Sequence, residues 1–173
     1  MIVALLAVNA NHTLRNVIVR VDGAPPSPPP LAPAIVAQDE CAYRPRISAV
    51  VAGQAIAVRN LDGTLHNVHS FVGTHSWFNQ AQLAGSSDIA RTAGNLGELI
   101  KLKCDVHPWM TAYVYVHDNG LTAVTDDNGR FRIDGVPPGR WPVVAWHERL
   151  GERRANALVT PAAVGSLELV YRE

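Results

Sequence analysis

The sequence predicts an all-β fold. The chain of 173 residues contains 12 prolines and 13 glycines, which interrupt helices and mark turns. Between these turn residues lie short segments that alternate or are rich in β-branched side chains, a pattern typical of sandwiches and barrels. Hydrophobic residues make up 47% of the chain and charged residues 17%, so there is enough apolar surface to form a packed core.

The charge balance excludes two broad classes of partner. Lysine plus arginine and aspartate plus glutamate each number 15, which gives a formal net charge of zero. Nucleic acids and anionic membranes attract proteins with a surplus of positive charge, so we expect no nucleic-acid partner. The sequence contains no apolar run of about 18 residues, so we expect no transmembrane segment.

The N-terminal residues predict strands followed by a linker. Residues 1–8 are apolar but lack the basic start of a signal peptide, so they predict a strand and no evident leader. Residues 17–21 are a second strand that ends at a turn. Six prolines lie between Ala24 and Pro33, so residues 24–37 predict an extended linker.

The middle of the chain, residues 38–117, predicts a second set of strands. These lie between glycine-containing turns, a spacing that favours a sandwich. Residues 76–91 are polar and rich in small side chains, and predict a long irregular connection. The expected strands are residues 47–51, 55–59, 67–71, 98–103 and 112–116.

The densest chemical information lies in residues 104–110, Cys-Asp-Val-His-Pro-Trp-Met. One loop can present Cys104, His107 and Met110 toward one point, and His66 at the start of an expected strand is the natural source of a second imidazole. Two imidazoles, a thiolate and a weak axial thioether are the donor set of a type 1 copper site. The sequence therefore predicts one copper ion as the cofactor.

These motifs resemble the cupredoxins, the plastocyanin- and amicyanin-like blue copper proteins. Residues 65–71, Leu-His-Asn-Val-His-Ser-Phe, are similar to the first-ligand strand of that family, although Leu65 stands where proline is common. Residues 104–110 are similar to the short ligand loop of amicyanin. The resemblance spans about residues 38–116 and implies a Greek-key β-sandwich that transfers electrons through copper.

The resemblance also implies supporting roles for residues around the ligands. Asn67 would tie the two ligand loops together near Asp105, outside the ligand set itself. The ring edge of His107, beside Pro108 and Trp109, would reach the surface within an apolar patch. A redox protein partner would dock transiently on that patch.

Cys41 leaves alternatives open. It is a plain buried thiol, a second metal thiolate, or a disulfide partner of Cys104, and the last would abolish a blue copper site. A zinc site made of Cys41, Cys104, His66 and His107 is the main competitor to copper. His147 and Glu148 could form an accessory pair, but nothing else in the sequence converges on them.

The C-terminal residues 118–173 resemble a second family. The stretch 123–141, with its Thr-Asp turn, Gly-x-Phe-x-Ile strand and Pro-Pro-Gly turn, is similar to carboxypeptidase regulatory-like, transthyretin-like sandwiches. The first strand expected in that family is missing upstream of Ala123, but residues 14–21 match it. We therefore expect residues 38–117 to be inserted into a small sandwich whose halves are residues 1–23 and 118–173.

Together these features predict a non-catalytic electron-transfer protein. Two rival functions are a copper-storage or interaction protein that does not shuttle electrons, and an electron-transfer subunit of a larger oxidoreductase. Copper use and the cupredoxin resemblance imply the periplasm or the cell exterior as the location.

Overall fold

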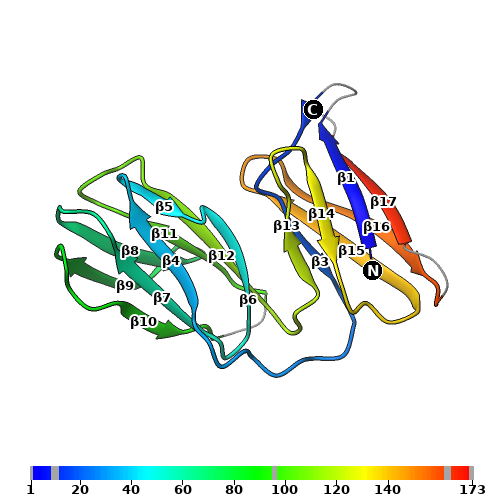
Figure 1. The fold of residues 1–173 in the computed structure, drawn as a ribbon, viewed down its shortest axis with the longest axis horizontal. Helices are drawn as coiled ribbons and strands as arrows, with labels where there is room; N and C mark the ends of the chain where they lie inside the picture. The colour runs from blue at the N-terminus through cyan, green and yellow to red at the C-terminus, as the bar shows by residue number, and fades with distance from the viewer. Residues whose placement is uncertain (1, 9–11, 95–96, 162–164, 172–173) are drawn as a thin grey trace. The chain divides into compact units, whose positions relative to one another are not determined.

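All regular secondary structure among the described residues is β-strand. The computed structural model describes residues 2–8, 12–94, 97–161 and 165–171, and these contain strands β1 to β17 and no helix (Figure 1). The predicted all-β class is confirmed. Contacts divide the chain into two compact units. We call them, by their places in the sequence, the inner unit, Ser27–Gly120, and the outer unit, Met1–Pro26 with Leu121–Glu173.

The inner unit contains two sheets. In the first, the strand order is β10-β7-β4-β5, with β4 parallel to β7 and the other neighbours antiparallel. In the second, the order is β6-β12-β11-β8-β9, with β6 parallel to β12 and the other neighbours antiparallel. The strands are β4 (Ala34–Asp39), β5 (Ala42–Arg44), β6 (Ile47–Val51), β7 (Ala55–Asn60), β8 (His66–Val72), β9 (His75–Gln82), β10 (Ile89–Thr92), β11 (Leu99–Lys103) and β12 (Thr111–His117).

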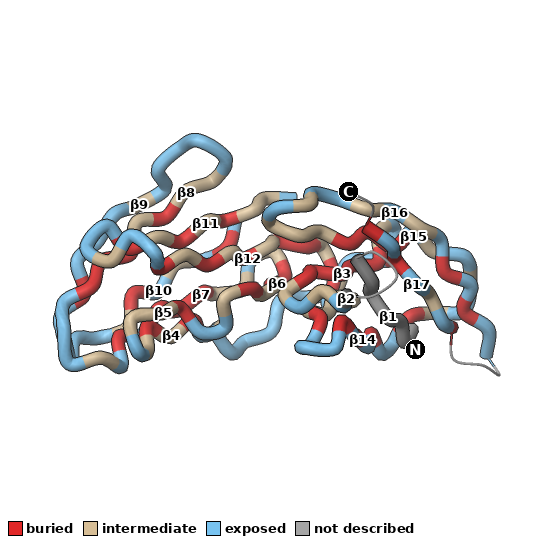
Figure 2. The backbone as a smooth tube through the Cα atoms, turned by 90° about the horizontal axis from the view of Figure 1, so that it is seen from above, coloured by how far each residue is buried: buried red, intermediate tan, exposed pale blue. Residues whose placement is uncertain are grey.

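The core of the inner unit follows from the alternation of its strands. Along β11 and most of β12 every second residue is buried, because successive side chains point to opposite faces of a sheet (Figure 2). Ile100, Leu102 and Val114 pack in one cluster with Val36 and Val58 of the other sheet. The two strands that flank residues 104–110 are thereby anchored in a packed core.

The outer unit also contains two sheets, built from both ends of the chain. One has the order β13-β3-β15-β16, and the other β14-β1-β17 with β2 paired to β1. Strand β3, from the N-terminal segment, pairs with β13 and β15 of the C-terminal segment. The strands are β1 (Ile2–Val8), β2 (His12–Thr13), β3 (Ile18–Val21), β13 (Thr122–Val124), β14 (Arg130–Ile133), β15 (Gly139–His147), β16 (Gly151–Val159) and β17 (Gly165–Tyr171).

A buried cluster fills the outer unit. It includes Val19, Phe131, Val143 and Tyr171, each at most 4% exposed. Arg20 of β3 is also buried, and its guanidinium donates to Glu152 at 2.8 Å. A charge can be buried in this way because it is paired.

Two sequence expectations differ from the structure. Strand β4 begins at Ala34, inside the stretch 24–37 that was expected to be linker, because the apolar residues after the last proline pair with β7. Residues 76–91 are not an irregular connection, since they contain most of β9 and the start of β10. Both are edge strands, and β9 is largely exposed, so its sequence lacks the alternation that marks a half-buried strand.

Over residues 2–8, 12–94, 97–161 and 165–171, no helix is long and apolar enough to cross a bilayer.

Candidate metal centre

The loop between β11 and β12 brings Cys104, His107 and Met110 together at one end of the inner core. The Cys104 amide donates to the carbonyl of Met110 at 3.3 Å, and the Met110 amide donates to the carbonyl of His107 at 2.9 Å. Cys104 is fully buried and Met110 is 1% exposed, both in the core cluster of the inner unit. Two backbone hydrogen bonds therefore close the short loop, and its two sulfur-bearing residues lie in the buried core.

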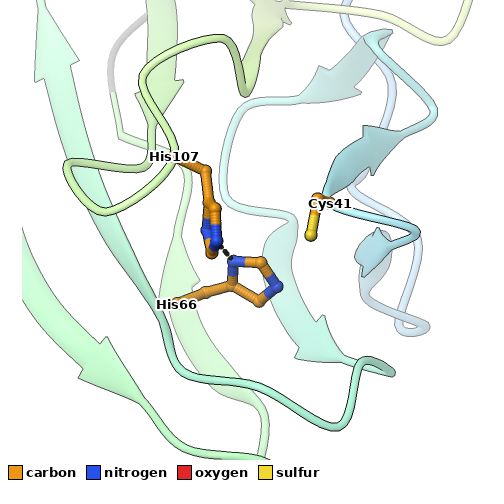
Figure 3. A group of neighbouring side chains, drawn as sticks. All are labelled: Cys41, His66 and His107. Atoms are coloured by element: carbon orange, nitrogen blue, oxygen red, sulfur yellow. Dashed lines mark hydrogen bonds between the residues drawn. The ribbon is translucent and has the colours of Figure 1, made fainter.

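His66, the first residue of β8, contributes the second imidazole from a distant part of the chain. Its side chain is fully buried. Nδ1 of His66 lies 3.0 Å from Nδ1 of His107, and Figure 3 shows the two rings meeting through these nitrogens. Sγ of Cys104 lies 3.8 Å from Nδ1 of His66 and 3.7 Å from Nδ1 of His107.

This triangle of two nitrogens and one sulfur has dimensions that a metal ion can fill. Zinc, whose bond lengths are similar to those of copper, binds imidazole nitrogen at about 2.0 Å and thiolate sulfur at about 2.3 Å. One point near the plane of these three atoms satisfies all three bond lengths. The donors, two imidazoles and one thiolate, are those of a trigonal copper site. The residues present thus fit a copper ion.

Asp62 orients His66 for this role. Its Oδ2 lies 2.8 Å from Nε2 of His66. A carboxylate only accepts hydrogen bonds, so Nε2 carries the proton and Nδ1 presents its lone pair toward Cys104 and His107. Burial alone would raise the pKa of Asp62, but the Cys41 amide, His66 and a second amide hold that pKa below its ordinary value.

Asn67 joins the two ligand-bearing segments. Its Oδ1 accepts from the Asp105 amide at 2.6 Å, and its Nδ2 donates to Oδ2 of Asp105 at 2.9 Å. Asn79 and His69 contact the same carboxylate, at 3.1 Å and 2.9 Å. Burial would raise the pKa of Asp105, and these three neighbours outweigh it and lower that pKa. His69 therefore belongs to the network around Asp105, the neighbour of Cys104.

Cys41 stands beside the imidazole pair. Its Sγ and one ring nitrogen each of His66 and His107 all lie within 4.8 Å of one another, and Figure 3 shows the sulfur pointing toward the two rings. Both cysteines are free thiols, so the disulfide alternative between Cys41 and Cys104 is not present. A small pocket of about 90 Å³ adjoins Cys41 and is lined also by Arg46, Trp109 and Met110.

Tyr43 of β5 connects the two sheets at this end. Its hydroxyl lies 3.2 Å from the carbonyl of Asn67 and 3.1 Å from that of Lys103, on β8 and β11. The side chain is buried, and this burial raises the pKa of the phenol. Tyr43 thereby fixes the strand ends from which both ligand segments start.

Sequence reasoning missed Asp62 and Tyr43. Asp62 lies four residues before His66 and next to Gly63, in one of the glycine-containing turns between the expected strands. A carboxylate just upstream of a candidate histidine ligand is a usable signal, because ligand histidines usually donate their other ring proton to such a group. Tyr43 carries no comparable signal, because its partners are backbone carbonyls on strands distant in sequence.

Exposed apolar side chains occur in the ligand loop and directly before His66. Trp109 is 67% exposed, Val106 50% and Leu65 41%. Pro108 is exposed and His107 is half-buried, with its ring centroid 5.3 Å from that of Trp109.

His147 and Glu148 lie elsewhere, in the outer unit. Nδ1 of His147 accepts from the Arg149 amide at 3.3 Å, and its ring contacts Tyr171. Among the residues that the structure describes, the group of metal-ligating side chains found contains neither of them.

Comparisons with known proteins give partial structural likenesses. No family model matches the chain, and no curated protein sequence does. A purple cupredoxin from Nitrosopumilus maritimus aligns with 22% identity and a TM-score of 0.42, over 48% of this chain and 98% of the other. A reduced amicyanin variant aligns with 18% identity and a TM-score of 0.45, over 57% and 98%. A copper-containing nitrite reductase from Thermus scotoductus SA-01 aligns with 18% identity and a TM-score of 0.44, over 50% of this chain and 22% of the other. The chain is thus similar in part to copper proteins of cupredoxin type.

Proposed function

We propose that this protein transfers single electrons through one type 1 copper ion held by His66, Cys104, His107 and Met110. The observation that carries the proposal is the donor triangle, in which Sγ of Cys104 lies 3.8 Å and 3.7 Å from two imidazole nitrogens that are 3.0 Å apart. Met110, buried in the same cluster, is the proposed axial donor.

The protein's part in electron transfer is to hold these donors in place. Copper, when bound, supplies reversible one-electron oxidation and reduction. Asp62 keeps the lone pair of His66 directed at the site, and Asn67 keeps the Cys104 segment against β8. Because the donors are positioned by hydrogen bonds from outside the ligand set, they need not rearrange when the charge of the centre changes.

His107 is the proposed port for electrons. It is the half-buried ligand of the set, and exposed Val106, Pro108 and Trp109 lie next to it in the loop. An apolar rim suits a transient contact, since such a surface releases water readily. The proposed partner is a redox protein that presents an apolar surface around its own centre.

The outer unit is proposed to be a transthyretin-like sandwich interrupted by the copper domain. The supporting observation is that β3 lies between β13 and β15 in one sheet, so the two ends of the chain form one unit. We assign it a scaffold or docking role. Periplasmic or extracellular location is proposed from the copper chemistry.

Copper loading tests the proposal. One equivalent of Cu(II) should give an intense blue colour from thiolate-to-copper charge transfer, which disappears on reduction and returns on reoxidation. Cys104→Ser should abolish the colour, and Met110→Leu should keep it while shifting the reduction potential. A colourless complex would instead favour zinc binding or copper storage, and a blue protein that cannot exchange electrons with small redox reagents would contradict electron transfer.

A further inference from the structure

Cys41 provides a second thiol at the proposed copper centre. Its Sγ lies within 4.8 Å of a ring nitrogen of His66 and of His107. Cys104 reaches the same two imidazoles at 3.8 Å and 3.7 Å. The sulfur atoms of two cysteines, Cys41 and Cys104, therefore lie beside the same pair of imidazole rings.

The backbone of Cys41 is held in a conformation that favours other residue types. Glu40 and Cys41 form the two-residue turn between β4 and β5, with φ of +53° and +52°. A hairpin turn with positive φ at both positions normally carries asparagine or glycine, because other side chains are strained there. Turn stability therefore does not explain a cysteine at this position, and such strain is concentrated at ligand sites.

Hydrogen bonds tie this strained turn to both ligand segments. The amides of Glu40 and Cys41 donate to the carboxylate of Asp62 at 2.8 Å and 3.0 Å, and that carboxylate also holds His66. From the other ligand loop, the indole of Trp109 donates to the carbonyl of Cys41 at 3.0 Å. The residues that position the ligands thus also position the Cys41 backbone.

The sulfur of Cys41 can move while its backbone stays fixed. Rotation between staggered χ1 rotamers carries Sγ through an arc of about 3 Å. The side chain is half-buried, and the pocket of about 90 Å³ beside it is lined also by Arg46 and Met110. The distance from Sγ to the imidazole nitrogens is therefore set by the χ1 rotamer as well as by the backbone.

We propose that Cys41 is a second sulfur donor of the centre, which binds cuprous ion together with His66 and His107, beside Cys104. The inference rests on the proposed copper function and deepens it. Thiolates are soft ligands that select Cu(I), so a second one stabilises the reduced state of the site. On binding, the S–H bond of Cys41 breaks, its proton passes to water, and sulfur donates the remaining electron pair to the ion. No electron is exchanged and no oxidant is needed.

Cuprous affinities of cysteine variants test the inference. The full chain, Cys41→Ala, Cys104→Ala and the double variant would be titrated anaerobically with Cu(I) against a coloured cuprous chelator. We expect Cys41→Ala to bind Cu(I) at least tenfold more weakly while keeping the Cu(II) charge-transfer band. We expect Cys104→Ala to lose the band but to bind Cu(I) at least tenfold more tightly than the double variant.

Two further variants distinguish the loss of the sulfur donor from a disturbance of the turn. Cys41→Gly suits the positive φ and should show the same loss of Cu(I) affinity as Cys41→Ala. Glu40→Ala changes the neighbouring turn residue without removing a donor, and should stay within twofold of the unmodified protein. Circular dichroism checks that each variant keeps its strands.

The outcomes distinguish this inference from the function on which it rests. If the unmodified protein turns blue with Cu(II) and Cys41→Ala matches its Cu(I) affinity, only the Cys41 inference is overturned. If the unmodified protein gives no charge-transfer band but Cu(I) binding depends on both cysteines, the second donor stands and the electron-transfer function is overturned. Equal Cu(I) binding by Cys104→Ala and the double variant also overturns the inference.

Discussion

Asp62 and His66 are joined by a 2.8 Å hydrogen bond between Oδ2 and Nε2. The same carboxylate accepts the amides of Glu40 and Cys41, so one side chain connects a proposed ligand to the turn that carries the second thiol. This relationship links the geometry of the metal centre to a part of the fold that supplies none of the four proposed ligands.

Replacement of this carboxylate should weaken copper binding. Asp62→Asn removes the charge and one acceptor, so the proton on Nε2 of His66 is no longer fixed, and loss of such a partner typically costs about 10–100-fold in metal affinity. Competition titration with Cu(II) measures the effect. Asp88→Asn is the matched control, because Asp88 is a carboxylate of the same unit that forms an ion pair with Arg59. Equal losses in both variants would contradict an orienting role for Asp62.

Removal of the Tyr43 hydroxyl should destabilise the inner unit. Tyr43→Phe leaves the carbonyls of Asn67 and Lys103 without this donor in a buried environment, at a cost of about 1–2 kcal/mol. Urea denaturation of the metal-free protein gives the change in unfolding free energy. Tyr113→Phe, on the partly buried face of β12, is a comparison with a less buried phenol. An unchanged free energy for Tyr43→Phe would show that water replaces the hydroxyl.

The strained turn should respond to glycine. Cys41→Gly and Cys41→Ala both remove the thiol, but only glycine adopts a φ of +52° without strain. We expect the glycine variant to be more stable than the alanine variant by about 0.5–1 kcal/mol, because relief of strain exceeds the extra freedom of the unfolded glycine chain. Thermal unfolding of the metal-free proteins measures this difference. Ala42→Gly, one residue further on in β5, should instead destabilise, and a stabilising effect there would undermine the assignment of strain to Cys41.

The partly buried ion pair between Arg20 and Glu152 of the outer unit should make stability depend on pH. Burial alone would raise the pKa of Glu152, but its hydrogen bonds and charge interactions with Arg20 and Arg154 outweigh this and lower the pKa. A lowered pKa means that Glu152 contributes stability above the ordinary pKa of glutamate and loses that contribution as the pH falls through the lowered value.

Glu152→Gln tests this dependence. Near neutral pH the variant should lose about 1–2 kcal/mol, less than for a fully buried pair because Glu152 is 38% exposed. At a pH below the lowered pKa the variant and the unmodified protein should converge. Glu168→Gln, on the exposed side of β17, should change little. A loss at Glu152 that is constant with pH would show that packing, not charge, is responsible.

The sequence predicted strands best where one face of each strand is buried. Strands such as β11 and β12 alternate because they lie in a sheet with one face on the core, and their sequence carries that period. The edge strand β9 carries no such period because its residues are mostly exposed, and strand pairing alone defines it. The end of the linker was misplaced because prolines dominate residues 25–33 and mask the start of β4 at Ala34.

The candidate site was predictable to the extent that its donors lie in two short motifs. The spacing of Cys104, His107 and Met110 confines them to one loop, and the start of a strand at His66 places the second imidazole. The contacts of Asp62 and the approach of Cys41 depend on how distant turns fold onto those motifs. Local sequence does not encode such contacts, since they involve backbone amides and a carbonyl.

The most direct test is the crystal structure of the copper-loaded protein, with the ion located by its anomalous scattering at the copper edge. One ion per chain should lie about 2.0 Å from Nδ1 of both His66 and His107 and about 2.3 Å or less from Sγ of Cys104. Copper bound at other residues, or an ion between the two imidazoles with Sγ of Cys104 out of bonding distance, would contradict the proposal that this protein transfers electrons through a type 1 copper site.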